Sequence, residues 1–151
     1  MTATLPAPNA AVEAEIAAIA DDLGSRYDVR RYLASGGFAT VWEAYDRGSN
    51  STVAVKRLKA TGPRSREFYR ELRATLALDH PCVVGLGNLL ECPRGTRYLI
   101  FEYCRGGSLR HRLREGQAAR PEWVADLAAQ LADGLAAAHS VGIAHRDVKP
   151  E

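Results

Sequence analysis

The stretch His145-Arg146-Asp147-Val148-Lys149-Pro150-Glu151 decides how this chain is interpreted. It sets one carboxylate, Asp147, between two cationic side chains, Arg146 and Lys149. The alternative is a polar tail with no role, but these seven residues in this order are improbable by chance. We therefore interpret the stretch as a functional loop and the preceding sequence as the scaffold that carries it.

Length and composition limit the class of protein. The 151 residues are enough for one ordinary domain, and 46% hydrophobic with 25% charged residues is a globular composition. The formal net charge of +2 is too balanced to indicate nucleic acid or a membrane as a partner. The cysteines Cys82, Cys92 and Cys104 form no CxxC pair, so we expect free thiols in a cytoplasmic protein.

No targeting or membrane segment is expected. The first 20 residues lack a basic start and place Glu13 and Glu15 inside their only apolar stretch, unlike a signal peptide. The longest apolar candidate, residues 124–144, contains Asp126 and Asp133 as well as a glutamine and a histidine. These are too many polar groups for the core of a bilayer.

The pattern of apolar residues predicts an α+β fold. A helix over 10–23, capped by Asn9 and ended by Gly24, belongs to an extension, 1–26, that packs on the next unit. From Tyr27 the period becomes that of strands. The predicted strands are 27–34, 38–45, 52–58, 84–90 and 98–103, and further helices are 63–78, 108–114 and 121–139. This order predicts an antiparallel sheet with one helix, followed by a helical region.

A glycine-rich turn lies between the first two predicted strands. Residues 33–41 read Leu-Ala-Ser-Gly-Gly-Phe-Ala-Thr-Val, small enough for the backbone to approach phosphate groups closely. Alanine at 34 and 39 keeps the approach close but makes a positive φ costly. An ordinary Gly-Gly hairpin would look similar, so this turn alone is weak evidence.

Two further strand motifs carry chemistry only in combination. Val53-Ala54-Val55-Lys56 places a lysine at the end of an alternating strand, where a solvated side chain is the ordinary alternative. Residues 99–109 form an apolar strand that ends in a Gly-Gly turn, which is common in itself.

In their joint order, these motifs resemble those of the bacterial, eukaryotic-like serine/threonine protein kinases. The resemblance covers residues 27–151. It implies the protein-kinase-like fold, with a five-stranded antiparallel small lobe (27–103), a hinge (102–108) and the start of the large lobe (109–151). A chain ending at 151 is therefore expected to be truncated within the catalytic loop.

The resemblance implies an ATP site in the small lobe and hinge. Lys56 would contact the α- and β-phosphates and pair with Glu71, with Glu67 one turn earlier as the competing partner. Phe101 would lie at the back of the adenine pocket, and the backbone of Glu102 and Cys104 would pair with the adenine edge. The implied ATP-binding residues are Leu33, Ala34, Ser35, Gly36, Gly37, Phe38, Ala39, Val41, Ala54, Lys56, Glu71, Phe101, Glu102 and Cys104.

The resemblance also assigns catalytic roles in the terminal stretch. Asp147 would accept the proton of a substrate hydroxyl or orient it, Lys149 would neutralise charge on the transferring phosphoryl group, and Arg146 would hold the activation segment. The expected reaction is ATP-dependent phosphorylation of protein Ser/Thr residues. Ligands for Mg²⁺ are expected downstream of residue 151 and none within the chain, so the chain alone is expected to be inactive.

Two alternatives remain open. The first is a catalytically incompetent nucleotide-binding or scaffolding fragment, like a pseudokinase. The second is a small-molecule kinase of the same fold, such as an aminoglycoside phosphotransferase, although those usually lack the Lys-Pro-Glu that follows the catalytic Asp here.

Overall fold

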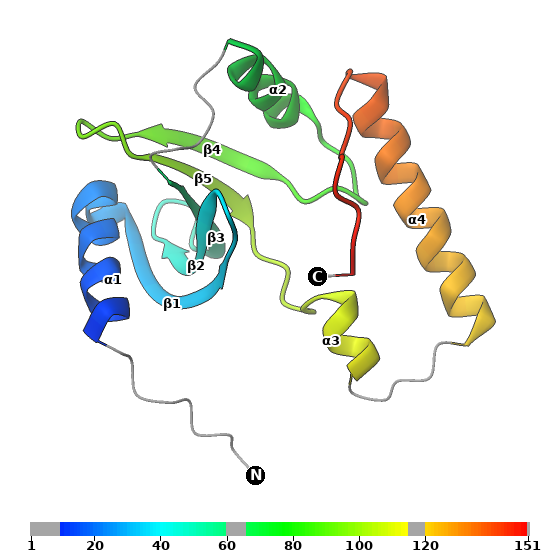
Figure 1. The fold of residues 1–151 in the computed structure, drawn as a ribbon, viewed down its shortest axis with the longest axis horizontal. Coiled ribbons are helices and arrows are strands. Elements are labelled where there is room, and N and C mark those ends of the chain that lie inside the picture. Colours follow the sequence, from blue (N-terminus) through cyan, green and yellow to red (C-terminus); the bar gives the residue numbers. More distant parts are fainter. Residues whose placement is uncertain (1–9, 60–65, 115–119, 151) are drawn as a thin grey trace. The chain divides into compact units, whose positions relative to one another are not determined.

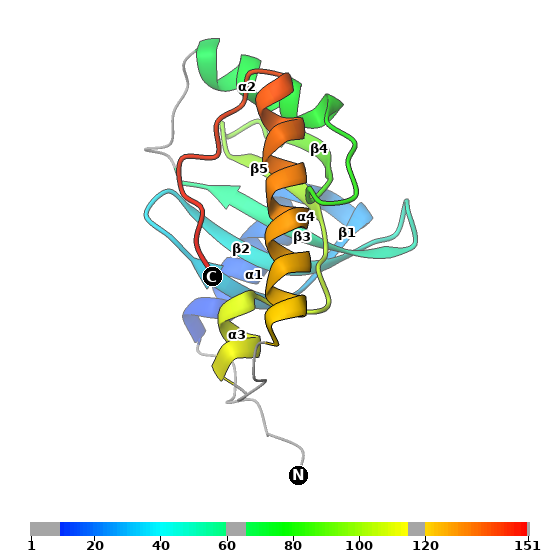
Figure 2. The same ribbon diagram turned by 90° about the vertical axis from the view of Figure 1, so that its right-hand side faces the viewer.

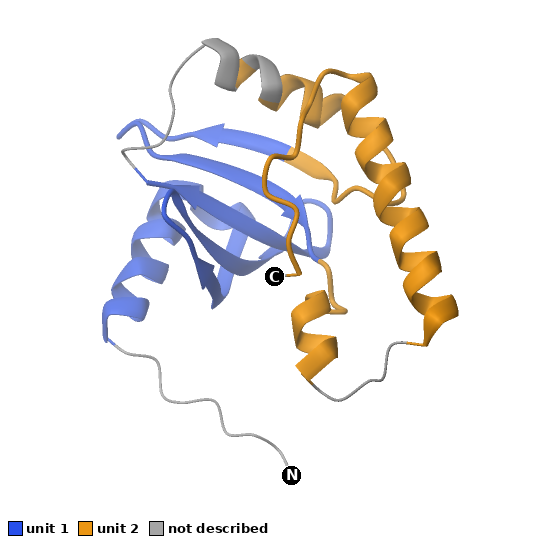
Figure 3. Ribbon diagram, turned by 45° about the vertical axis from the view of Figure 1, so that its right-hand side comes forward, with its two compact units in different colours: residues 1–62, 88–103 blue, residues 63–87, 104–151 orange. Residues whose placement is uncertain are grey.

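The computed structural model describes residues 10–59, 66–114 and 120–150, and the chain divides into two compact units (Figure 3). Unit 1 comprises residues 1–62 and 88–103, and unit 2 comprises residues 63–87 and 104–151. Most of the strands belong to unit 1, and three of the helices belong to unit 2. The residues Asn9 and 63–65, to which a helix cap and a helix start were assigned, lie outside the described residues.

The sheet is five-stranded, as predicted, and its strand order is β1-β2-β3-β5-β4 (Figure 1). Neighbours β1–β2, β2–β3 and β3–β5 pair antiparallel. The bounds are β1 Tyr27–Ser35, β2 Ala39–Asp46, β3 Ser51–Leu58, β4 Leu86–Glu91 and β5 Arg97–Glu102. The predicted bounds miss by one or two residues. Phe38, for example, lies in an exposed turn rather than in a strand.

The helix α1, Ala10–Leu23, lies against one face of this sheet (Figures 1 and 2). Its Ile19 is fully buried with Trp42, Val55 and Tyr98 of β2, β3 and β5. Full burial of a large apolar side chain contributes about 1.5–3 kcal/mol. The helix α1 therefore contributes to the core of unit 1, in line with the expectation of a helix over 10–23 that packs on the next unit.

An ion pair fixes the corner where β1 begins and β2 ends. After α1 and the 3-10 turn η1 (Gly24–Arg26), Arg26 donates two hydrogen bonds to the nearly buried carboxylate of Asp46, at 2.8 and 2.9 Å. The amide of Gly48 and the hydroxyl of Ser49 donate to the same carboxylate. These donors, Arg26 foremost, hold the pKa of Asp46 well below its usual range.

The lowered pKa of Asp46 predicts that the stability of the folded chain depends on pH. The folded pKa of Asp46 lies below that of the unfolded chain, about 3.9. Its stabilising contribution is therefore present above that pH and is lost as the pH falls toward the folded pKa. Between pH 5 and 3 the melting temperature of the wild type should fall more than that of Asp46→Asn. Asp28→Asn removes an exposed ion pair with Arg30, and its melting temperature should fall as much as that of the wild type. Parallel curves for wild type and Asp46→Asn would contradict the assignment.

Unit 2 contains the helices α2 Arg66–Ala77, α3 Leu109–Arg114 and α4 Pro121–Ser140. Pro121 opens α4, where its missing N–H is not needed. Gly142, with φ 78°, ends it: the amide of Ile143 donates to the carbonyl of Ala138, and the amide of Gly142 to that of His139. Within the described ranges, no helix is long and apolar enough to cross a membrane.

Gly134 allows α4 to approach the loop that precedes β4. A Cβ added at Gly134 would lie 2.7 Å from the carbonyl oxygen of Cys82, closer than real side chains come. The helix therefore carries a glycine in its interior because of this contact, although glycine lowers helix propensity.

Gly134→Ala should lower the stability of the chain, whereas helix propensity alone predicts a gain of about 1 kcal/mol. We expect a loss of about 1–3 kcal/mol, because the new methyl group overpacks the contact with Cys82. The check is the midpoint of urea unfolding. Ala132→Gly, at an exposed position of α4, is the control and should cost about 1 kcal/mol through propensity. A more stable Gly134→Ala chain would show that the contact is not tight.

Candidate active site

The glycine-rich turn between β1 and β2 is closed by hydrogen bonds to its own backbone and to one lysine. The amide of Gly36 donates to the carbonyl of Ala39 at 2.9 Å. The backbone amide of Lys59 donates to the carbonyl of Phe38 at 2.9 Å, and its ammonium to the carbonyl of Gly36 at 2.7 Å. The sequence reasoning missed Lys59, because nothing in its neighbourhood marks a residue just after a strand as a partner of this turn.

The alanines of the turn carry no backbone strain. Among the described residues other than glycine, only Asn50 and Arg146 have a positive φ. The cost foreseen for alanine at positions 34 and 39 is therefore absent. Ala39 is the first residue of β2, pairs with Leu58 of β3, and is 5% exposed. Its backbone is extended because the ladder begins there.

Ala39→Gly should therefore destabilise the chain, by about 0.5–1 kcal/mol, instead of relieving strain. The change frees the backbone of a strand residue and removes a buried methyl group. Gly37→Ala is the matched control: an added Cβ there meets nothing within 4 Å, and the φ of Gly37 is not positive, so stability should be unchanged or slightly higher. The free energies of unfolding of both variants, measured by urea denaturation, test this prediction. A more stable Ala39→Gly chain would mean that the turn is strained after all.

The strand register puts the predicted nucleotide-facing residues of unit 1 on one face of the sheet. Val41 pairs with Lys56, and Ala54 pairs with Phe101. Side chains alternate along a strand, so these four share a face, and Trp42, Val55 and the other residues packed against α1 lie on the opposite one. One face is thus filled by the core, and the other presents an apolar surface with a single lysine among these four residues.

An ion pair that the sequence reasoning missed lies on the same face. Arg31 of β1 donates to the carboxylate of Glu43, and also to the hydroxyl of Tyr103 at 3.1 Å. Glu43 pairs with Ala54 in the ladder, so the network lies beside the candidate adenine-covering residue. The bond from Arg31 lowers the pKa of Glu43, which keeps it ionised. No sequence signal finds this network, because its members are far apart along the chain.

Some predicted site residues are not tested by the structure. The side chains of Glu71 and Glu67 lie outside the described ones, although α2 carries both positions as predicted. The pairing of Lys56 with Glu71 therefore stays a prediction. Cys104 is exposed and belongs to unit 2, whereas Glu102 ends β5 in unit 1.

The terminal stretch is positioned within unit 2 from both of its ends. The glycine cap of α4 turns the chain out of the helix at Gly142, and the carbonyl of Pro150 accepts a hydrogen bond of 2.8 Å from the amide of Arg110 in α3. Between them, Arg146 has a φ of 62°, a left-handed conformation that costs energy in any residue but glycine. Such strain persists only where surrounding contacts impose it, and it is common at functional loops.

Asp147 and Lys149 form an ion pair at the surface of unit 2. The ammonium of Lys149 donates to the Asp147 carboxylate at 2.5 Å, and the amide of Asp147 donates to Nδ1 of His145 at 3.3 Å. The bond from Lys149 lowers the pKa of Asp147. The carboxylate is therefore ionised at neutral pH and, with two-thirds of the side chain exposed, free to accept a further hydrogen bond.

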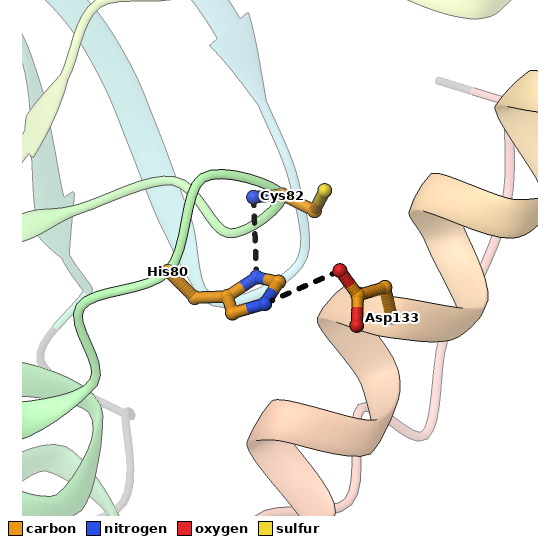
Figure 4. A group of neighbouring side chains, drawn as sticks. All are labelled: His80, Cys82 and Asp133. Atoms are coloured by element: carbon orange, nitrogen blue, oxygen red, sulfur yellow. Dashed lines mark hydrogen bonds and ion pairs between the residues drawn. The ribbon is translucent and has the colours of Figure 1, made fainter.

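A group of possible metal ligands lies between α4 and the loop before β4 (Figure 4). It consists of Asp133 of α4 and of His80 and Cys82 of the loop, with their potential ligand atoms within 4.8 Å of one another. Nδ1 of His80 accepts the amide hydrogen of Cys82 at 3.2 Å, so the proton of the neutral ring is on Nε2, which lies 3.4 Å from the Asp133 carboxylate. A metal at Nε2 would have to break this arrangement. We interpret the group as a structural link between the loop and α4, in line with the close contact of Gly134.

Neither the terminal stretch nor the group around His80 fits a magnesium site. Mg²⁺ prefers several oxygen ligands in octahedral geometry, and the terminal stretch offers it one described carboxylate, Asp147, already paired with Lys149. The group around His80 supplies nitrogen and sulfur, which suit other metals.

Sequence comparison finds similar proteins over most of the chain. The protein kinase domain family matches residues 27–151. The serine/threonine-protein kinase PkaB of Streptomyces coelicolor is 39% identical over 137 residues, which cover 88% of this chain and 32% of the relative. The probable serine/threonine-protein kinase pknA2 of Bifidobacterium longum is 35% identical over 133 residues, covering 83% and 17%. Calcium/calmodulin-dependent protein kinase type 1B of Rattus norvegicus is 34% identical over 133 residues, covering 87% and 38%. The chain thus spans well under half the length of each of these curated relatives.

Proposed function

The chain belongs to the protein kinase family, and from that premise we propose that its activity is the transfer of the γ-phosphoryl group of ATP to serine or threonine hydroxyls of proteins. The observation that carries the proposal is the ionised carboxylate of Asp147, held by Lys149 in a loop with a strained backbone at Arg146. A bacterial relative named as a serine/threonine-protein kinase supports the choice of acceptor.

In this proposal unit 1 binds the nucleotide. Val41 and Ala54 cover the adenine ring, Phe101 lies behind it, and the backbone of Glu102 pairs with its edge. Lys56, on the same sheet face, neutralises charge on the α- and β-phosphates. The backbone amides of the glycine-rich turn approach the phosphates, which its small side chains permit.

In unit 2, Asp147 accepts a hydrogen bond from the hydroxyl that is to be phosphorylated. Its lowered pKa makes it a weak base, so orientation of the hydroxyl is its main contribution before the proton is transferred. Lys149, already beside the carboxylate, places a positive charge where the transferring phosphoryl group develops negative charge. Mg²⁺ would add charge neutralisation at the phosphates.

The cytoplasm, where ATP is available, remains the proposed compartment. The alternative is a nucleotide-binding or scaffolding protein without transfer activity. Both hypotheses assign the same nucleotide-binding role to unit 1. Measurement of binding and transfer on the same variants therefore separates the two.

The test appends, after residue 151, the part of PkaB that follows its match to this chain. It then measures both ATP binding and phosphorylation of a Ser/Thr peptide. Lys56→Met should lower turnover by about two to four orders of magnitude, because its charge positions and stabilises the phosphates in the transition state. Asp147→Asn should abolish transfer and leave ATP binding within about twofold, since it acts on the acceptor. The 151-residue chain alone should bind ATP without transferring phosphate above background.

Arg30→Met is the control for loss of a strand cation, because Arg30 is exposed and its guanidinium contacts Asp28 and the ring of Tyr45. It should change neither binding nor turnover. ATP binding with no transfer in the extended chain, unaltered by Asp147→Asn, would favour the scaffolding alternative. No ATP binding at all would contradict the proposed function.

A further inference from the structure

The helix α1 makes polar contacts with the sheet close to the glycine-rich turn. The carboxylate of Glu15 accepts hydrogen bonds from the hydroxyl of Thr40 and from the guanidinium of Arg57, each at 3.2 Å. The hydroxyl of Thr40 in turn accepts the indole N–H of the fully buried Trp42 at 3.0 Å. Glu15 thus ends a chain of hydrogen bonds that begins in the core.

A second acidic residue of α1 contacts the sheet two helical turns later. The hydroxyl of the buried Tyr98 donates to the carboxylate of Asp22 at 2.7 Å. Burial and this bond raise the pKa of Tyr98, so its hydroxyl stays protonated and remains a donor. An acid near the C-terminus of a helix is unfavourable toward the helix dipole, and the bond to Tyr98 explains why Asp22 is placed there.

The spacing of the two acids matches the spacing of the strands. Thr40 pairs with Arg57, and Arg57 pairs with Tyr98, so the three contacted residues form one row across β2, β3 and β5. The distance from β2 across β3 to β5 is about 9.6 Å, twice the spacing of neighbouring strands. The rise along α1 from position 15 to position 22 is about 10.5 Å, which is similar. The helix α1 therefore crosses the sheet along this row, with one acid at each end of it.

The row lies at the base of the glycine-rich turn. Thr40 pairs with Ser35 of β1, so only residues 36–39 lie between these two paired residues. The contacted side chains are on the face packed against α1, opposite to Val41, Ala54 and Lys56. The acids of α1 thus restrain the turn from behind, without occupying the face that would hold the nucleotide.

We propose that α1, which precedes the family-matched residues 27–151, acts as a clamp that preorganises the glycine-rich turn for nucleotide, with Glu15 as its positioning residue. The effect of the clamp on the affinity for ATP rests on the proposed function, whereas its restraint of the glycine-rich turn does not. A turn held in place by Glu15 from behind and by Lys59 at its tip loses less conformational freedom when it closes over phosphates. The clamp therefore acts on the affinity for nucleotide rather than on the chemical step.

The first experiment titrates the 151-residue chain with a fluorescent ATP analogue. Glu15→Ala should raise the dissociation constant about three- to tenfold and leave the signal at saturation unchanged, because it removes hydrogen bonds to a charged acceptor. Glu13→Ala, at an exposed position of the same helix, should leave the dissociation constant unchanged. Glu15→Gln keeps an acceptor for Thr40 but no charge for Arg57, so its dissociation constant should lie between those of the wild type and Glu15→Ala. It also shows whether loss of the charge alone is enough to weaken binding.

The second experiment is a charge exchange, read by amide hydrogen exchange in residues 35–41. Glu15→Arg and Arg57→Glu should each accelerate exchange about three- to tenfold, and the double variant should return to within about twofold of the wild type. Loss of helix packing alone would not be rescued in this way. The clamp is refuted if Glu15→Ala matches Glu13→Ala in the first experiment, or if amide exchange in the double variant is no slower than in the single variants of the second. If the wild type binds no nucleotide, the proposed function fails, and hydrogen exchange still decides the clamp.

Discussion

The register of β2, β3 and β5 is the constraint on which the rest of unit 1 depends. Because side chains alternate along each strand, the pairing of Val41 with Lys56 and of Ala54 with Phe101 sends one set of residues to the core and the other to the candidate nucleotide face. A slip of one residue would exchange the two faces and expose Trp42 and Val55. The burial of these side chains against Ile19 therefore maintains the functional face as well as the core.

The candidate catalytic stretch in unit 2 depends on backbone geometry rather than on burial. The glycine cap at Gly142 sets the direction in which the chain leaves α4, and the amide of Arg110 holds the carbonyl of Pro150. Between these points the left-handed backbone of Arg146 precedes Asp147, which keeps an exposed carboxylate beside Lys149. An exposed acid with a cation next to it is ionised, accessible to a substrate, and stabilised by contacts that do not enclose it.

Several polar contacts among the described residues fix elements relative to their neighbours within a unit. Asp46 with Arg26 fixes the corner between β1 and β2, and Glu15 fixes α1 on the row of residues behind the glycine-rich turn. His80 links its loop to α4, where Gly134 lets the two backbones come close. Apolar burial supplies the stabilisation of such cores, and directional hydrogen bonds select one arrangement among those that burial would tolerate.

The sequence by itself determined the order of the elements and the family. The periods of the apolar residues predict the helix over 10–23 and all five strands to within one or two residues, because both periods are local properties of the chain. The linear order of motifs, ending at Asp147 and Lys149, identifies the kinase family without a structure. Only the tertiary structure showed that Lys59 closes the glycine-rich turn, that Arg31 reaches Tyr103, and that Asp22 and Glu15 contact a row across three strands. It also showed that the alanines of the turn are unstrained. These features depend on strand register and on contacts between residues far apart in the chain, which no local pattern records.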